Sequence, residues 1–549
     1  MQFCFGQSTR GIVLLGALLS VQYSQGVQQL IQHVPPAAIA SAATGSLPAA
    51  RRLHLSVGLP LRNPVELTNL LHELYDPASP NYRNFLTPGE FTARFGPNEQ
   101  DYQALVNYFS AQGFSIRATH PNRVLLELEG SVAVIEKTLH VTMRQYRHPF
   151  EARNFFGPDR EPRLDVDVPV LHISGLDDFM LPHPASLHLQ PLDKGNGPVP
   201  NGGSGPGGLY MGKDFPAAYA PGVTLNVAGQ YVGLLQFDGF YPNDIASYAS
   251  RASLTNVPVI PVLLDGFDGS PGKANIEVAL DIEMSMSMAP GLAGIIVYEG
   301  LDGNDILNRM ANDNLAKQLS SSWMFPTDAA TEVIYQQMIA QGQSYFNASG
   351  DGGAYTGTVP TPTDSASVTS VGGTTLTTRG PGQAWVSEKA WNWANTGQGN
   401  QATAGGVSTV VPIPVWQQGM DMTASQGSTS MRNIPDVAMV ADQVFVISDN
   451  GQQVSAGGTS VASPLWAAFT ALVNQQAAYS GLPPVGFLNP AVYSLGQGGS
   501  YTSVFHDITT GNNTNASSPN RFYAVAGYDL CTGWGTPVGR SLIDALETF

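Results

Sequence analysis

A glycine- and proline-rich stretch divides this chain into two unequal parts. Residues 195–208 read GNGPVPNGGSGPGG and carry almost no side chain that could pack in a core, which is typical of an exposed linker. With 549 residues, the chain also exceeds what a single hydrophobic core usually serves. We therefore expect two folded domains, a smaller one before this stretch and a larger one after it.

The N-terminal segment has the features of a secretory signal. Arg10 precedes an apolar run from Gly11 to Val21, which is too short to span a bilayer as a mature helix. We assign residues 1–26 to this signal and expect a secreted, extracellular protein. Cys4 would leave with the signal, so that Cys531 remains alone and the mature chain forms no internal disulfide.

The charge of the chain is sparse and negative. Charged residues make up 12% of the sequence, against a usual share of roughly 25%, and the formal net charge is −17. These values argue against nucleic acid and against stable membrane association. Residues 1–190 hold 14 basic and 16 acidic side chains, whereas the rest of the chain holds 11 and 26. The excess of negative charge in the larger part causes repulsion at neutral pH, and partial protonation in acid would relieve it. An acidic surface can also serve solubility alone.

The periodicity of apolar residues differs between the two parts. In the smaller part it predicts an α+β domain with strands at 53–59, 114–119, 123–129 and 141–146 and helices at 64–74, 98–112 and 132–139. In the larger part, apolar runs alternate with helical patterns, which predicts parallel strands with crossover helices: strands at 231–235, 257–264 and 293–297, helices at 329–339 and 464–475. This alternation indicates an α/β sheet that helices cover on both faces.

A tight turn between a strand and a helix presents a candidate nucleophile. Residues 457–464 read GGTSVASP and precede an apolar helix from Leu465 to Val473. Pro464 is tolerated in a first helical turn, where its missing N–H is no loss. Ser460 would then lie at the helix N-terminus with its backbone N–H free to help hold an oxyanion. Taken alone, this serine is more typical of an ordinary helix cap than of a nucleophile.

A serine nucleophile needs a base, and the usual base is histidine. Nine of the ten histidines precede the linker, and only His506 follows it. Carboxylates can replace histidine, and Glu277 and Asp281 stand four residues apart, on one face of a helix. Like charges at that spacing disfavour each other, and the surrounding residues are so apolar that the helix is expected to be buried. Two acids at this spacing in an apolar helix are better explained by a shared function than by a solvated helix face.

A third acid, Asp351, lies in the sequence SGDGG of residues 349–353. The flanking glycines permit close approach of the backbone. By itself the residue is also typical of an aspartate in a turn.

Taken in order, these motifs resemble those of the sedolisins, also called serine-carboxyl peptidases. The resemblance rests on Glu-x-x-x-Asp, Ser-Gly-Asp and Gly-Thr-Ser-x-x-Ser-Pro, and it extends to VTSVGGTTL at 368–376 and IPDVA at 434–438. Upstream, YRNFLT at 82–87 and FGP at 95–97 resemble an activation domain of the pro-kumamolisin type. Each motif alone is weak evidence, but the order in which they occur is specific. The resemblance covers nearly the whole chain after the signal.

The resemblance implies a fold and a division of the chain. It implies a subtilisin-like parallel sheet with helices on both faces, preceded by a ferredoxin-like α+β prodomain. We expect the activation prodomain at residues 27–190, a linker with the processing site at 191–208, and the peptidase domain at 209–549.

The resemblance also implies roles for single residues. Ser460 would be the nucleophile, Glu277 the general base, Asp281 the acid that orients Glu277, and Asp351 the acid of the oxyanion hole. Trp323 matches a tryptophan of the family's substrate-binding strand. Gln236 stands where some acid-stable members carry a glutamate, which argues against a carboxylate network beyond Asp281.

A calcium site is implied near the C-terminus. Asp507-Ile508 and Gly527-Tyr528-Asp529 resemble the calcium-binding residues of the family. The ligands would be the side chains of Asp507 and Asp529 and the backbone carbonyls of Ile508, Val525 and Gly527, which suits the preference of Ca²⁺ for six to eight oxygens.

The sequence thus predicts a secreted serine-type endopeptidase that acts in acid, roughly at pH 3 to 5, through an acyl-enzyme and a Ser-Glu-Asp triad. Its partners would be protein or peptide substrates and its own prodomain, which would inhibit the enzyme until self-processing. The alternative is a catalytically inactive, calcium-stabilised secreted binding protein on the same fold.

Overall fold

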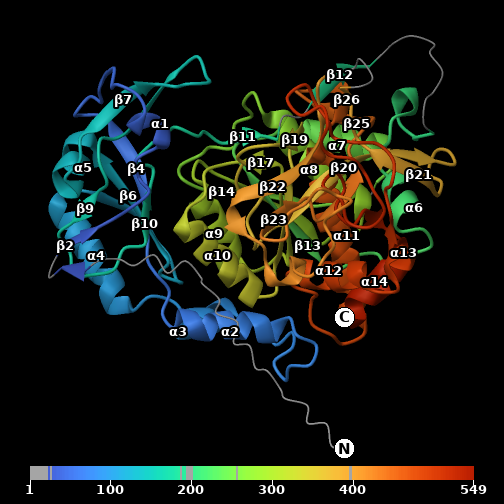
Figure 1. Ribbon diagram of the computed structural model, residues 1–549, viewed down its shortest axis with the longest axis horizontal. Helices are drawn as coiled ribbons and strands as arrows, with labels where there is room; N and C mark the ends of the chain where they lie inside the picture. Colours follow the sequence, from blue (N-terminus) through green and yellow to red (C-terminus); the bar gives the residue numbers. More distant parts are fainter. Residues whose placement is uncertain (1–22, 25–26, 186–187, 193–201, 255–256, 395–398) are drawn as a thin grey trace, which may run out of the picture.

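The computed structural model describes the whole chain except residues 1–22, 25–26, 186–187, 193–201, 255–256 and 395–398 (Figure 1). The predicted signal lies almost entirely outside the described residues, as does the first half of the predicted linker. Residues 202–208 are described, and Pro206–Gly208 form a single 3-10 turn. None of the described helices combines the length and apolar character that crossing a membrane requires.

The N-terminal part is built on a four-stranded antiparallel sheet with the order β10-β4-β6-β5. The helices α4 and α5 connect its strands, in the chain order β4-α4-β5-β6-α5-β10. This arrangement is the ferredoxin-like one that was expected. The bounds are β4 Arg52–Gly58, α4 Glu99–Gln112, β5 Ser115–Thr119, β6 Leu125–Ser131, α5 Val132–Leu139 and β10 His172–Ser174.

The predicted strand at 141–146 forms, but it does not close this sheet. It is β7 (Met143–Arg147), which pairs with β3 (Gly45–Ser46) and β8 (Asn154–Pro158) in a separate three-stranded sheet. The fourth place in the main sheet belongs to β10, which lies much later in the chain. Local alternation predicted the strand correctly but carries no information about its partner.

Two further helices reach from this part onto the larger one (Figure 1). Helix α2 (Pro64–Leu74) and helix α3 (Pro88–Arg94) bury an apolar cluster that includes Ala340 of the larger part. The hydroxyl of Tyr75 donates to the carbonyl of Ile339 at 2.8 Å. Arg83 donates to the carbonyls of Leu546 and Glu547 at 2.7 and 2.9 Å, so that it binds the C-terminal helix α14 (Gly539–Thr548).

The C-terminal part contains an eight-stranded sheet with the order β14-β15-β13-β16-β18-β20-β21, and β24 also pairs with β20. All pairings are parallel except that of β20 with β21. The bounds are β13 Tyr231–Gln236, β14 Val259–Leu263, β15 Gly294–Glu299, β16 Gln318–Ser321, β18 Ser344–Ala348, β20 Thr369–Thr378, β21 Trp385–Ala390 and β24 Val437–Val440.

Both faces of the sheet are buried at its central strands, as the near-continuous apolar runs predicted, whereas the edge strand β14 leaves Ile260 and Leu263 exposed. In β15, Ile295 and Val297 belong to the core under helices α8 (Asn275–Met288) and α11 (Thr459–Tyr479). The alternate residues Ile296 and Tyr298 belong to the core under α9 (Gly303–Asp313) and α10 (Ala329–Ala340). Because side chains alternate along a strand, one strand serves two cores.

Candidate active site

Helix α8 carries the two acids that the sequence singled out. Glu277 lies in its first turn and Asp281 one turn further on, and both side chains are fully buried. The helix is apolar around them and packs beside α11 in the core on one side of the sheet. Residues four apart share a helix face, so that the sequence places both carboxylates in one buried environment.

Helix α11 presents Ser460 as its second residue, directly after strand β26 (Gln452–Gly457). The expectation for Pro464 was wrong, because α11 begins at Thr459 and Pro464 lies inside the helix instead of in its first turn. A proline there cannot donate to the carbonyl of Ser460. The hydroxyl of Ser322, whose one proton is shared with Asp281, also contacts that carbonyl, at 3.3 Å. This contact comes from the residue between β16 and β17, far from α11 in the sequence.

Two donors fix Asp281. Ser322 Oγ donates to Oδ1 and Gln236 Nε2 donates to Oδ2, both at 2.7 Å. Burial raises the pKa of Asp281 to about 7, although these two hydrogen bonds oppose the rise. The carboxyl is therefore held in one orientation beside Glu277.

Glu277 and Ser460 face each other without other partners. Among the described residues, neither oxygen of the Glu277 carboxyl nor Oγ of Ser460 has a partner at hydrogen-bonding geometry. Burial raises the pKa of Glu277 well above its ordinary value, and the negative charges of Asp281 and Asp351 raise it further. The hydroxyls of Ser460 and Ser322 oppose this rise, which places both close to the Glu277 carboxyl.

Asp351 approaches the same point from the end of strand β18. Its Oδ1 accepts hydrogen bonds from the backbone N and from Oγ1 of Thr459, at 2.7 and 2.8 Å. Its Oδ2 is buried without a partner among the described residues. Burial raises the pKa of Asp351 to about 7 against the effect of those two bonds. Gly350 has a φ of 106° and no room for a Cβ against the hydroxyl of Tyr355, so the turn requires a glycine there.

The end of the N-terminal part runs past this site on both sides. Strand β11 (His183–Pro184) pairs antiparallel with β17 (Trp323–Met324), and Ala185 N donates to the carbonyl of Ser322 at 2.9 Å. Strand β12 (His188–Pro191) pairs antiparallel with β26, where His188 lies opposite Gly457. Two short strands at the end of this part, one on each side of residues 186–187, thus pair with strands of the larger part, one with β17 and one with the strand that leads to Ser460.

The C-terminal loop brings the predicted calcium ligands together. Gly527 N donates to Asp507, and Val525 N donates to Asp529 Oδ2 at 3.1 Å, so one loop positions both carboxylates. Their charges, together with burial, raise the pKa of Tyr501, whose hydroxyl donates to Asp507 at 3.0 Å. None of the described hydrogen bonds ends on the carbonyl oxygens of Ile508, Val525 or Gly527. This set of oxygens fits a hard cation such as Ca²⁺.

The four catalytic candidates and the two calcium carboxylates each lie where the sequence grouped them, but sequence reasoning missed the residues that hold the site together. Thr459 lies in the motif around Ser460 but was given no role, Ser322 was not singled out, and Gln236 was interpreted only as the absence of an acid. The one available signal was position, because Thr459 directly precedes Ser460 and Ser322 directly precedes Trp323.

Comparison with known proteins agrees with this geometry. Residues 40–179 match the family model of the pro-kumamolisin activation domain. Xanthomonalisin of Xanthomonas sp. (strain T-22) is 29% identical over 91% of this chain and 66% of its own length. Kumamolisin of Bacillus sp. (strain MN-32) is 29% identical over 85% of this chain and 87% of its own.

A solved structure extends the likeness to three dimensions. Pseudomonas sedolisin, a serine-carboxyl proteinase complexed with pseudo-iodotyrostatin, matches with a TM-score of 0.53 and 26% identity, over 60% of this chain and 96% of that chain. The chain is a kumamolisin-like member of the sedolisin family of serine-type peptidases and carries an N-terminal activation domain.

Proposed function

We propose that this protein is a secreted endopeptidase that acts in acid through a Ser460-Glu277-Asp281 triad. The observation that carries the proposal is the buried juxtaposition of Ser460 Oγ and the Glu277 carboxyl, which have no other hydrogen-bond partner among the described residues. A purely structural serine or glutamate would be costly to bury in this state.

The chemistry would follow from these positions. Ser460 Oγ attacks the scissile carbonyl carbon while Glu277 accepts the hydroxyl proton. Asp281 orients Glu277, and Asp281 is itself fixed by hydrogen bonds from Gln236 and Ser322. The tetrahedral intermediate collapses when Glu277 gives its proton to the leaving amine, which leaves an acyl group on Ser460. Water, deprotonated by Glu277, then releases the acid product and restores the serine.

Asp351 would stabilise the charge that develops on the carbonyl oxygen. Its Oδ1 is occupied by Thr459, and its free Oδ2 can carry a proton. A protonated carboxyl donates to an oxyanion, whereas an ionised one repels it. Since the raised pKa of Asp351 keeps it protonated below about pH 7, this role also favours acid conditions.

The prodomain would act as an intramolecular inhibitor, because its last strands pair with β17 and with β26, the strand that leads to Ser460. Cleavage within residues 191–208 would separate it. Secretion rests on the signal pattern of residues 1–26. Ca²⁺ at the loop of Asp507 and Asp529 would supply positive charge to one partly exposed and one buried carboxylate and so stabilise the C-terminal fold.

The test is to compare Ser460→Ala and Glu277→Ala with the wild type on an unstructured protein at acid pH. Both variants should lose several orders of magnitude in activity and remain folded, and the double variant should be little worse than either single one, because nucleophile and base act as a unit. Ser480→Ala, an exposed serine just after the same helix, is the matched control. Near-wild-type activity of Glu277→Ala would refute the base assignment. Failure of the wild type to react with a serine-directed peptide aldehyde would favour the inactive binding protein.

A further inference from the structure

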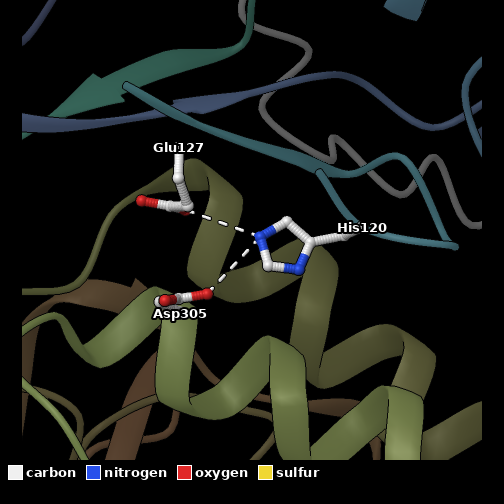
Figure 2. A group of neighbouring side chains, drawn as sticks. All are labelled: His120, Glu127 and Asp305. Carbon is white, nitrogen blue, oxygen red and sulfur yellow. Dashed lines mark ion pairs between the residues drawn. The ribbon is translucent and has the colours of Figure 1, made fainter. Parts of the chain in front are cut away.

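Three side chains outside the active site converge where the two domains meet. Figure 2 shows the ring of His120 turned toward the carboxyl groups of Glu127 and Asp305. His120 Nε2 lies 3.8 Å from Glu127 Oε1 and 3.4 Å from Asp305 Oδ1. All three ligand atoms lie within 4.8 Å of one another. His120 and Glu127 belong to the prodomain, from the turn after β5 and from β6, whereas Asp305 lies in the first turn of helix α9.

Two of these atoms are buried without the partners they need. Glu127 is 8% exposed, and among the described residues neither its Oε1 nor His120 Nε2 has a hydrogen-bond partner. The distances to one another are too long for a hydrogen bond, but they suit a shared ion. Ligands about 2.0–2.2 Å from a tetrahedral Zn²⁺ lie roughly 3.3–3.5 Å apart.

Among the described residues, His120 is the basic side chain that pairs with Glu127 and Asp305. The two arginines that line the adjoining cavity, Arg52 and Arg117, pair with Glu129 instead. This cavity, of about 750 Å³, lies between the domains, and both Glu127 and Asp305 line it, so that an ion and its water ligand have a route to the site.

The surroundings hold each ligand in place. Ser56 Oγ donates to Glu127 Oε2 at 2.7 Å, which leaves Oε1 for the ion. The backbone N of His120 donates to the hydroxyl of Tyr102 at 3.1 Å. Asn122, two residues further on, donates to Asn308 and Gln337 at 2.6 and 2.8 Å and so fixes the turn onto helices α9 and α10. Ligands oriented by such outer contacts are the usual arrangement in metal sites.

We propose that His120, Glu127 and Asp305 form a Zn²⁺ site that joins the prodomain to the peptidase domain. One imidazole and two carboxylates are ligands that Zn²⁺ accepts, and three protein ligands leave a fourth position for water. Because the ligands come from both domains, the ion binds the precursor and stabilises its assembled form.

The experiment uses the full chain with Ser460→Ala, which keeps it uncut, at neutral pH with Ca²⁺ in excess. Zn²⁺ titration followed by calorimetry and by melting temperature should show one bound ion and a higher Tm. His120→Gln and Asp305→Asn should each weaken Zn²⁺ binding by at least about 100-fold, and Ser56→Ala, which removes the hydroxyl that donates to Glu127, by about 10- to 100-fold. Co²⁺ should give the visible absorption of a four- or five-coordinate ion, and His120→Gln should abolish it.

The matched control is His140→Gln. His140 also pairs with a carboxylate, Asp165, at 2.8 Å, but both side chains are about half exposed and no third ligand joins them. Zn²⁺ affinity should be unchanged in this variant. Affinity that survives both His120→Gln and Asp305→Asn, or that falls equally in His140→Gln, would overturn the site. If His120→Gln or Asp305→Asn is unstable without metal, Ser56→Ala is tested in its place. Unchanged Zn²⁺ affinity of Ser56→Ala would then contradict the proposal.

Discussion

Gln236 joins the acid behind Glu277 to the tryptophan of strand β17. Its Nε2 donates to Asp281 Oδ2 at 2.7 Å, and its Oε1 accepts from Trp323 Nε1 at the same distance. All three side chains are almost fully buried. Because an amide does not ionise, the run of titratable groups that begins at Glu277 ends at Asp281.

This contact predicts a difference between two substitutions of Gln236. Gln236→Leu leaves the indole N–H and one oxygen of Asp281 without partners, which should cost about 1–3 kcal/mol each and slow turnover about 10- to 100-fold. Gln236→Glu should retain more activity in acid, because a protonated carboxyl still donates to Asp281. Its advantage should fade as pH rises and the new carboxyl ionises beside Asp281. Turnover of both variants from pH 3 to 7 checks this, and parallel pH profiles would contradict it.

Buried acids also set how stability depends on pH. The pKa of Asp351 is raised from 3.8 to about 7, so the folded state holds a proton there that the unfolded chain loses from about pH 4 upward. The stabilisation is therefore complete below about pH 4 and is lost as pH rises to about 7. The change is on the order of 4 kcal/mol.

We accordingly expect the Tm of the uncut Ser460→Ala chain to fall between about pH 4 and pH 7, and Asp351→Asn to reduce that fall. Asp421→Asn is the control, because the pKa of this exposed aspartate is lowered by its bonds with Thr423. Thermal unfolding across this range measures both. If Asp351→Asn leaves the fall of Tm with pH unchanged, carboxylates other than Asp351 cause this fall.

Calcium should raise the Tm of the folded chain, and the rise should grow with the logarithm of the free ion concentration once that concentration exceeds the dissociation constant. Asp529→Ala will destabilise the loop in any case, because Asp529 accepts hydrogen bonds from Cys531 N and Thr532 N, both at 2.8 Å. The informative measurement is thus the response to the ion. Asp507→Ala and Asp529→Ala should each make Tm insensitive to added Ca²⁺ and to chelation, whereas Asp421→Ala should respond as the wild type does. An equal response of Tm to Ca²⁺ in all variants would contradict the proposed calcium site.

The sequence predicted best where structure is decided locally. Helices α2 and α5 have the predicted bounds, because Pro64 opens the first and the Ser131 hydroxyl accepts from Val134 N at the start of the second. The start of α11 was missed because Pro464 lies inside this helix, where the carbonyl of Ser460 contacts the hydroxyl of Ser322, a residue far away in the sequence. No local rule contains that contact.

The candidate site was also predictable only where local sequence decides the structure. Glu277 and Asp281 could be paired from helix periodicity, and glycines marked the turns around Asp351 and Ser460. The convergence of these turns came from resemblance rather than from spacing. His120, Glu127 and Asp305 form no sequence motif at all, because only the docking of two domains brings them together.

The last prediction concerns Asp351 itself. Its Oδ1 is held by Thr459, and its Oδ2 has no partner among the described residues, so one proton on Oδ2 makes it a donor beside Ser460. Losing one oxyanion-hole donor typically costs on the order of 10²–10³ in turnover. Asp351→Ala should therefore be slowed by about that factor, with KM less affected.

Asp351→Asn should retain more of the turnover than Asp351→Ala. The asparagine oxygen can still accept from Thr459, and its amide donates where Oδ2 carried the proton. Because the amide has no proton to surrender, turnover of this variant should lose its dependence on the pKa near 7, while the wild type loses turnover as pH rises through that value. The measurement is kcat against pH for wild type and both variants, with folding checked by Tm. Equal loss in Asn and Ala variants that remain folded would mean that Asp351 positions Thr459 and the start of α11 but donates nothing to the substrate.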